Sequence, residues 1–131
     1  MKFLIVDDSG LSRRMIRNCL VKLGHETVEA ADGAAALERY IIDRPDFVFL
    51  DLVMPGLTGF EVLNHLRLID PAARVIISTA DVQSSTREQV KQSGALTVIN
   101  KPVTIEQISS ILNSILSGEA ISASADAADL R

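Results

Sequence analysis

The chain has 131 residues, a single cysteine, Cys19, and no long apolar run. One cysteine excludes an intramolecular disulfide and fits a reducing compartment. A membrane-spanning helix needs about 18 consecutive apolar residues, and no stretch of the chain approaches that length. Met1-Lys2 leads straight into a strand-like run. We therefore expect no secretory signal, no membrane insertion and a cytoplasmic location.

Clustered basic residues and clustered histidines are also scarce. The net charge is -4, and the basic residues are scattered apart from Arg13, Arg14 and Arg17, which argues against direct binding to nucleic acid. His25 and His65 lie on different predicted elements, so no His or Cys cluster offers a transition-metal site. What remains is an ordinary globular composition, 47% hydrophobic, in a chain of one-domain length.

Strand-like and helix-like segments alternate along this domain. The predicted strands cover residues 3–6, 27–30, 47–50, 75–79 and 97–100. A helical pattern follows each strand, and the five patterns end at or before Gly24, Pro45, Pro71, Gly94 and Ser117. This alternation predicts an α/β fold, a doubly wound five-stranded parallel sheet with helices on both faces and right-handed crossovers.

Apolar residues at helical spacing predict one buried side for each helix. The predicted buried residues are Met15, Ile16, Cys19, Leu20 and Leu23 in the first helix, Leu37, Tyr40 and Ile41 in the second, Phe60, Leu63 and Leu66 in the third, Val90 in the fourth, and Ile105, Ile108, Ile111, Leu112, Ile115 and Leu116 in the fifth. The fourth helix should therefore pack weakly, and Cys19 counts as a core residue rather than a nucleophile. Two pairs, Ser85 with Glu88 and Thr104 with Gln107, are spaced as capping boxes.

Charged and hydroxyl side chains stand where four predicted strands end. Asp7-Asp8 follow the first strand, Asp51 the third, Thr79 ends the fourth, and Lys101 follows the fifth. The carboxyl ends of the strands form the binding crevice of an open parallel sheet. Three carboxylates there repel one another, and Mg²⁺, which prefers carboxylate, water and phosphate oxygens, removes the conflict.

An aspartate beside Mg²⁺ can attack a phosphoryl group and form an acyl phosphate. Lys101 and Thr79 would hold two phosphoryl oxygens, since such transfer needs positioning and charge neutralisation above all. Each residue also has an ordinary interpretation: the acid pair can cap a helix, Asp51 can begin a turn before Pro55-Gly56, Thr79 suits any strand, and Lys101 can be a solvated charge. Together at the strand ends of one sheet, they indicate a Mg²⁺-dependent phosphoryl site.

Four stretches together make residues 1 to about 117 resemble the receiver domain of two-component response regulators. They are Ile5-Val6-Asp7-Asp8, Leu50-Asp51-Leu52-Val53-Met54-Pro55-Gly56, Ser78-Thr79-Ala80 and Lys101-Pro102. The resemblance implies the flavodoxin-like strand order 2-1-3-4-5, the order known for the chemotaxis receiver. The receiver would cover residues 1–117. Residues 118–131, rich in Ala, Ser and Asp, would form a tail or linker and are expected to be disordered.

The resemblance also assigns roles to the acids. Asp51 matches the phosphoacceptor, and Asp8 and Asp51 match direct Mg²⁺ ligands. Asp7 matches an acid that acts largely through bound water, and the backbone carbonyl of Val53 would complete the metal site. Lys101 matches the phosphate-binding lysine.

The rest of the switch follows from the same resemblance. Thr79 matches the hydroxyl that moves onto the phosphoryl group, and the Lys101-Pro102 bond is expected to be cis. A phosphohistidine on a sensor histidine kinase would donate the phosphoryl group. The fourth helix, fifth strand and fifth helix would form the output face for a downstream protein target or phosphatase. The domain would not be an enzyme beyond catalysing its own aspartyl phosphorylation and dephosphorylation.

The chain departs from the family pattern at two positions. Many relatives carry an aromatic residue where this chain has Val98, so burial of a ring cannot report the signal here. Val53 stands two residues after the phosphoacceptor, where a polar side chain could orient the attacking water. We therefore expect slow self-dephosphorylation, although Asp81 offers a partial substitute.

The resemblance of residues 9–17 to chemotaxis-type receivers favours a stand-alone switch. Several other functions compete with it. The chain could be a receiver from a longer regulator with an output domain beyond Arg131. A dehalogenase-type phosphatase would need a second aspartate where Val53 stands. A flavodoxin would need a phosphate loop after the first strand, where Asp7-Asp8 would repel the flavin phosphate. A receiver that is never phosphorylated is disfavoured, because every site residue is present.

Overall fold

A computed structural model describes residues 1–80 and 84–118, with the backbone alone for residues 84–86. Within this part of the chain, strands and helices alternate throughout. The strands are β1 (Lys2–Val6), β2 (Glu26–Ala30), β3 (Phe47–Asp51), β4 (Val75–Thr79) and β5 (Thr97–Asn100). The helices are α1 (Gly10–Lys22), α2 (Gly33–Asp43), α3 (Gly59–Ile69), α4 (Ser84–Gln92) and α5 (Ile105–Leu116). The predictions for Asp81 and for residues 119–131 fall outside the described residues.

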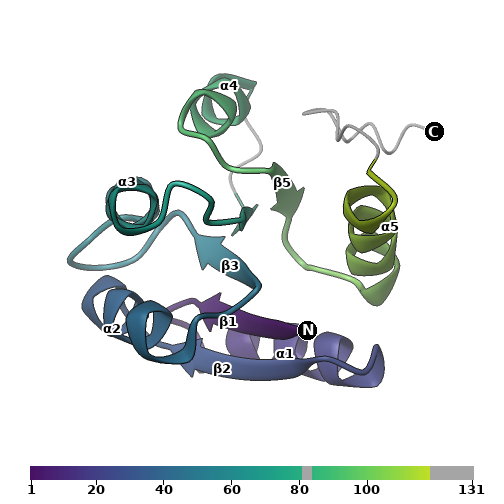
Figure 1. Cartoon of the computed structure of the whole chain (residues 1–131). Coiled ribbons are helices and arrows are strands. Elements are labelled where there is room, and N and C mark those ends of the chain that lie inside the picture. The colour runs from purple at the N-terminus through teal and green to yellow at the C-terminus, as the bar shows by residue number, and fades with distance from the viewer. Residues whose placement is uncertain (81–83, 119–131) are drawn as a thin grey trace.

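The strands form one parallel sheet in the order β2-β1-β3-β4-β5 (Figure 1). Both the predicted fold class and the strand order implied by the resemblance are confirmed. None of the helices that the structure describes is long and apolar enough to cross a membrane.

Alternate residues of each strand feed two separate cores, one on each face of the sheet. Leu4 and Val6 of β1 pack on the side of α2, α3 and α4, whereas Phe3 and Ile5 pack on the side of α1 and α5. The central strands β3 and β4 are buried along their whole length. Parallel strands covered on both faces need such continuous apolar runs, which explains why the sequence identified them readily.

Polar side chains begin most of the helices. The N-cap residues Ser9, Asp32, Thr58 and Thr104 each accept a hydrogen bond from the backbone N–H three residues later. The predicted capping box of Thr104 with Gln107 is confirmed. A second capping box, Thr58 with Glu61, was not predicted. Helix α4 begins at Ser84, one residue before the predicted cap, and the side chain of Ser85 lies outside the described part.

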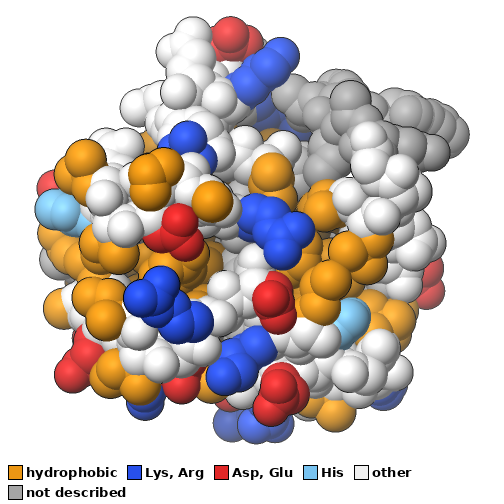
Figure 2. Space-filling model, in the orientation of Figure 1, with side chains coloured by type: hydrophobic (Ala, Val, Ile, Leu, Met, Phe, Trp, Pro, Cys, Tyr) orange, Lys and Arg blue, Asp and Glu red, His pale blue; other side chains and the backbone are white. Residues whose placement is uncertain are grey.

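The sequence predicted more buried residues in the helices than the structure shows. Met15, Ile41 and Leu116 are 44%, 54% and 54% exposed, so their prediction as buried residues is wrong. Each lies at the margin of its apolar stripe, and the sheet covers only the centre, where Ile16 and Leu112 are buried. Figure 2 shows such apolar side chains at the surface, interspersed with charged ones. Among the α4 side chains of residues 87–92, Val90 alone is buried.

Helix α3 starts in direct contact with the end of β3. The Gly59 N–H donates to the Leu52 carbonyl oxygen at 3.0 Å. A Cβ at Gly59 would overlap the Asp51 carbonyl oxygen and the Leu52 Cα. Both neighbours are backbone atoms that cannot rotate away, so only glycine fits here. This close approach fixes the backbone that carries Asp51.

Candidate functional site

Three carboxylates meet at the carboxyl edge of the sheet. Asp7 and Asp8 follow β1, Asp51 is the last residue of β3, and one carboxylate oxygen from each lies within 4.8 Å of the others. Asp7 and Asp51 are 0% and 6% exposed, whereas Asp8 is open to solvent. The structure thus brings together the acids that the sequence placed at separate strand ends.

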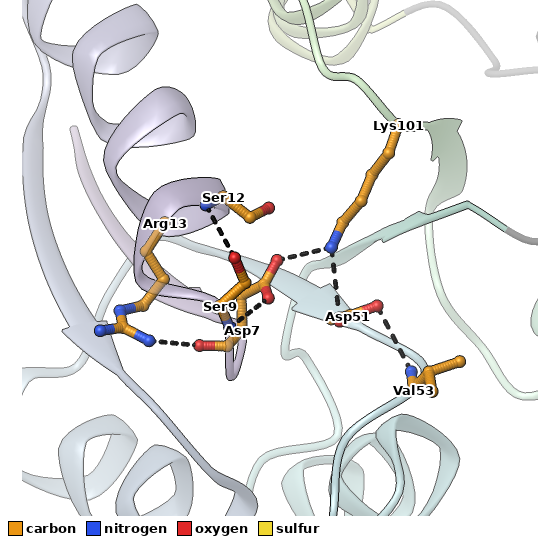
Figure 3. Close-up of polar contacts among 7 residues, drawn as sticks. All are labelled: Asp7, Ser9, Ser12, Arg13, Asp51, Val53 and Lys101. Carbon is orange, nitrogen blue, oxygen red and sulfur yellow. Dashed lines mark hydrogen bonds and ion pairs between the residues drawn. The ribbon is translucent and has the colours of Figure 1, made fainter.

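Lys101 reaches this cluster from the end of β5 (Figure 3). Its Nζ donates to Asp7 Oδ2 at 2.7 Å and lies 3.4 Å from Asp51 Oδ2. Its backbone N–H donates to the Thr79 carbonyl oxygen at 2.8 Å, which fixes its position against β4. The peptide bond to Pro102 is cis, as the resemblance implies.

The sheet register places the two hydroxyl residues of β4 differently. Ser78 is the direct neighbour of Asp51 across the β3–β4 pair, and directly paired residues of a parallel sheet share a face. Thr79 is the next residue, fully buried at the same edge. It alternates with Ser78 and belongs to the face of α2, α3 and α4. The structure therefore places Thr79 at the site edge and Ser78 beside the predicted phosphoacceptor.

Opposing influences act on the pKa of Asp7. Burial would raise the pKa of its carboxyl group, but hydrogen bonds from Lys101, Ser12 and the Ser9 N–H favour the charged form. The Ser9 N–H donates to Asp7 Oδ1 at 2.9 Å. The result is a pKa below the usual range of an aspartate. Asp7 therefore stays ionised, with both carboxylate oxygens engaged.

Asp51 carries the opposite shift. Burial raises the pKa of Asp51, the charge of Lys101 lowers it and the charge of Asp7 raises it, with a net rise. Burial would lower the pKa of Lys101, but its hydrogen bond to Asp7 and the charge of Asp51 raise it overall. One charged lysine thus serves two buried carboxylates and holds Asp7 more closely. Asp51 remains under-compensated, which is the condition that a bound cation relieves.

The donor set fits Mg²⁺. All three side chains offer hard oxygen atoms, and Asp8 opens the cluster to solvent, so a cation can keep several of its waters. Val53 lies directly beside the cluster, because its N–H donates to Asp51 Oδ1 at 3.3 Å. Its side chain is 71% exposed, so an apolar group is open to solvent next to Asp51.

Arg13 is a residue at this site that the sequence reasoning missed. Its Nη1 donates to the Asp7 carbonyl oxygen at 2.6 Å, a contact that the sequence did not predict. A signal was present: long side chains in the first turns of a helix slant toward its N-terminus, so Arg13 is aimed back at the strand end.

Comparison with known proteins agrees with this geometry. The family model of the response regulator receiver domain matches residues 3–113. The chain belongs to the response regulator receiver domain family. This confirms the resemblance that the sequence motifs suggested, and it removes the support for a flavodoxin or a dehalogenase-type phosphatase.

The receiver domain is similar to both phosphorelay and chemotaxis proteins. It is 40% identical over 107 residues to sporulation initiation phosphotransferase F of Bacillus subtilis, covering 82% of this chain and 86% of that protein. It is 39% identical over 116 residues to chemotaxis protein CheY of Bacillus subtilis, covering 88% of this chain and 97% of that protein. A solved relative is the CheX-CheY-BeF3-Mg²⁺ complex from Borrelia burgdorferi, with a TM-score of 0.83 and 28% identity, covering 88% of this chain and 89% of that one.

Proposed function

We propose that this receiver domain is a phosphorylation-dependent switch that accepts a phosphoryl group on Asp51 from a sensor histidine kinase. The observation that carries the proposal is the under-compensated Asp51 carboxylate, buried beside Asp7 and Lys101 and reached from solvent past Asp8. The Borrelia burgdorferi relative was crystallised with BeF3 and Mg²⁺, which supports the same chemistry here.

We assign the Mg²⁺ ligands to Asp8, Asp51 and the backbone carbonyl of Val53. Asp7 would act through bound water, because its two carboxylate oxygens already accept hydrogen bonds from the Ser9 N–H and Lys101. Bound Mg²⁺ supplies neutralisation of the negative charge shared by the carboxylates and the phosphoryl oxygens.

The chain's own residues carry the transfer. An Asp51 carboxylate oxygen attacks phosphorus, the P–N bond of the donor phosphohistidine breaks, and the imidazole nitrogen keeps the electron pair and takes a proton from water. Lys101 is already 3.4 Å from Asp51 and moves onto a phosphoryl oxygen. The Thr79 hydroxyl, at the same edge of the sheet, moves from the face of α2, α3 and α4 to donate to another phosphoryl oxygen. The domain is thus a switch that catalyses only its own phosphorylation and dephosphorylation.

We place the output face on α4, β5 and α5, where phosphorylation would shift a pre-existing equilibrium. The weak packing of α4, with Val90 as the one buried side chain among residues 87–92, supports this assignment. A small hollow of about 40 Å³ lies between α4 and β5 and includes Val98 in its lining. The partner there would be a protein target or a phosphatase in the cytoplasm.

The alternative is a receiver cut from a longer regulator, with residues 118–131 as a linker to an output domain beyond Arg131. In that case the same face would contact the attached domain. The full coding sequence distinguishes the two versions directly.

The test is intact mass after incubation with acetyl phosphate, with and without Mg²⁺, for the wild type and Asp51→Asn. Phosphoramidate serves as a second donor, since it contains the P–N bond of a phosphohistidine. We expect a single Mg²⁺-dependent phosphoryl adduct in the wild type and none in Asp51→Asn. An adduct that persists in Asp51→Asn, or no adduct with either donor, contradicts the proposal.

A further inference from the structure

Arg13 ties the start of α1 to the ends of two strands. Its Nη1 donates to the Asp7 carbonyl oxygen at 2.6 Å, and its Nε donates to Glu29 Oε1 of β2 at 3.0 Å. Figure 3 shows the guanidinium on the side of Asp7 opposite Lys101. Asp7 is therefore held from both sides, by its side chain on one and by its backbone on the other.

The Asp7 carbonyl is a sensitive point of the backbone. The β1–β2 pairing ends at Val6 with Ala30, and the Asp7 N–H still donates to the Ala30 carbonyl oxygen at 3.2 Å. The Asp7 carbonyl oxygen lies beyond this pairing and accepts from Arg13. It shares one rigid, planar peptide unit with the N and Cα atoms of Asp8. Whatever holds this oxygen therefore sets where the Asp8 side chain begins.

Asp8 depends on that backbone more than Asp7 does. The Asp7 carboxylate is fixed by the Ser9 N–H and Lys101. The Asp8 carboxylate is exposed, and no hydrogen bond or ion pair from the described residues holds it. Its position within 4.8 Å of an Asp51 oxygen therefore depends on where the backbone places the Asp8 Cα, with no side-chain contact from the described residues to hold it.

We propose that Arg13 is a positioning residue for Mg²⁺ binding. By holding the Asp7 carbonyl oxygen it fixes the Asp7–Asp8 peptide, and through it the Asp8 carboxylate opposite Asp51. This inference rests on the proposed function, because it takes the acids to be Mg²⁺ ligands.

Glu29 completes the arrangement. A bare positive charge near three carboxylates would oppose a cation, because like charges repel. Glu29 accepts from the Arg13 Nε and so both orients the guanidinium and offsets its charge. Arg17 lies 3.8 Å from the other Glu29 oxygen but has no contact with Asp7 among those the structure describes. Arg17 is thus a matched control, with the same charge, helix and acidic partner.

A purely electrostatic role and a positioning role predict opposite changes in Mg²⁺ affinity for Arg13→Met. If Arg13 acted only as a nearby charge, Arg13→Met would bind Mg²⁺ more tightly than the wild type. If Arg13 positions Asp8, the same substitution weakens binding. The lost contact orients a ligand without touching the metal, and changes of this kind weaken metal binding about tenfold or more.

The experiment is calorimetric titration with Mg²⁺ alone, with thermal unfolding of each variant recorded in metal-free buffer. We expect Arg13→Met to raise the dissociation constant about tenfold, and Arg17→Met to leave it unchanged or lower it slightly. Arg13→Lys keeps the charge but has a single nitrogen in place of the Nε and Nη1 atoms that hold Glu29 and the Asp7 carbonyl, so it should also bind Mg²⁺ more weakly. A purely structural tie would change the melting temperature and leave the dissociation constant unchanged.

The outcomes separate this inference from the function it rests on. If the wild type binds Mg²⁺ and Arg13→Met binds it equally or more tightly, only the positioning role is overturned. No Mg²⁺ binding by the wild type counts against the proposed function itself. If Arg13→Met does not fold, Arg13→Lys decides the question, because it keeps the positive charge and removes the two-point contact of the guanidinium. We expect weaker binding by Arg13→Lys, and wild-type affinity would overturn the inference.

Discussion

The two edges of the sheet treat charge in opposite ways. At the carboxyl edge, one lysine contacts two of three clustered carboxylates, and the pKa of Asp51 is raised by burial. At the amino edge, the carboxylates of Asp70 and Asp46 accept hydrogen bonds from neutral donors. The Tyr40 hydroxyl donates to Asp70 Oδ2 at 2.7 Å, and the Lys2 N–H donates to Asp46 Oδ2 at 2.8 Å. The amino edge is arranged for stability, whereas the carboxyl edge keeps unbalanced charge that a ligand can use.

The difference extends to the two buried acids of the carboxyl edge. Asp7 takes the short bond to Lys101 and has a lowered pKa, so its ionised form stabilises the fold. Asp51 has a raised pKa, so its ionised form destabilises the fold. Neighbouring aspartates thus act in opposite directions, and the destabilising one is the proposed phosphoacceptor.

The largest effect should come from the backbone contact that holds Asp51. Gly59→Ala would place a methyl group onto the Asp51 carbonyl and the Leu52 Cα. We expect a loss of about 3 kcal/mol in the free energy of unfolding, measured by urea denaturation, because overpacking against backbone forces a shift. Gly10→Ala is the control, since it also changes the first residue of a helix but meets only Arg13 Nη2 at 3.6 Å. A Gly59→Ala protein as stable as the control would contradict the packing argument.

The next effect separates the two acids. At pH 7, without metal, Asp7→Asn should lose about 2 kcal/mol, because it removes a charge-assisted hydrogen bond. Asp51→Asn should gain on the order of 1 kcal/mol, because a buried charge is removed. Urea denaturation at several pH values measures both.

The pH dependence follows from the directions of the shifts. The stability that Asp7 contributes is present above its unfolded pKa and is lost as pH falls through its lower folded pKa. The penalty from Asp51 appears as pH rises through its raised folded pKa, so the gain of Asp51→Asn should vanish in acid. If both variants gained stability at pH 7, or both lost it, the division of roles would be refuted.

Much of the fold was predictable because β1, β3 and β4 each contain a short, buried apolar run. A continuous apolar run such as residues 47–50 indicates a strand in a sheet that is covered on both faces. The acids of the site were predictable for the same reason, since each stands where an apolar run stops. Helix margins were harder: Met15 and Ile16 look alike in sequence, and only the packed sheet decides which is buried.

Contacts between distant elements could not be predicted. The Arg13 contact with the Asp7 carbonyl requires α1 to be placed against β1, and the Tyr40–Asp70 bond joins residues 30 apart on α2 and beyond α3. The capping box of Thr58 with Glu61 is a different case. Its spacing is visible in the sequence and was overlooked.

A smaller effect should come from the amino edge. Tyr40→Phe removes the hydroxyl that donates to Asp70, and we expect a loss of about 1 kcal/mol at pH 7. Burial, followed by the hydrogen bond to Asp70, raises the pKa of Tyr40 to about 12. The stabilisation is therefore complete below pH 10 and is lost as pH rises toward 12. Unfolding of the wild type and Tyr40→Phe across this pH range measures the loss. An unchanged Mg²⁺ dissociation constant in Tyr40→Phe would show that the two edges are independent, and a weaker Mg²⁺ affinity would show that they are coupled.

The smallest effect should leave stability alone and alter only the lifetime of the phosphoryl group. The Val53 side chain is 71% exposed, and its N–H donates to Asp51 Oδ1, so a polar side chain at this position is available to an attacking water. An amide in Val53→Asn would hold that water and shorten the lifetime a few-fold, about 1 kcal/mol or less in activation free energy. Val53→Leu, equally apolar, is the control. Intact mass at intervals after removal of the phosphodonor measures the decay. An unchanged lifetime in Val53→Asn would mean that water reaches Asp51 without help from this position.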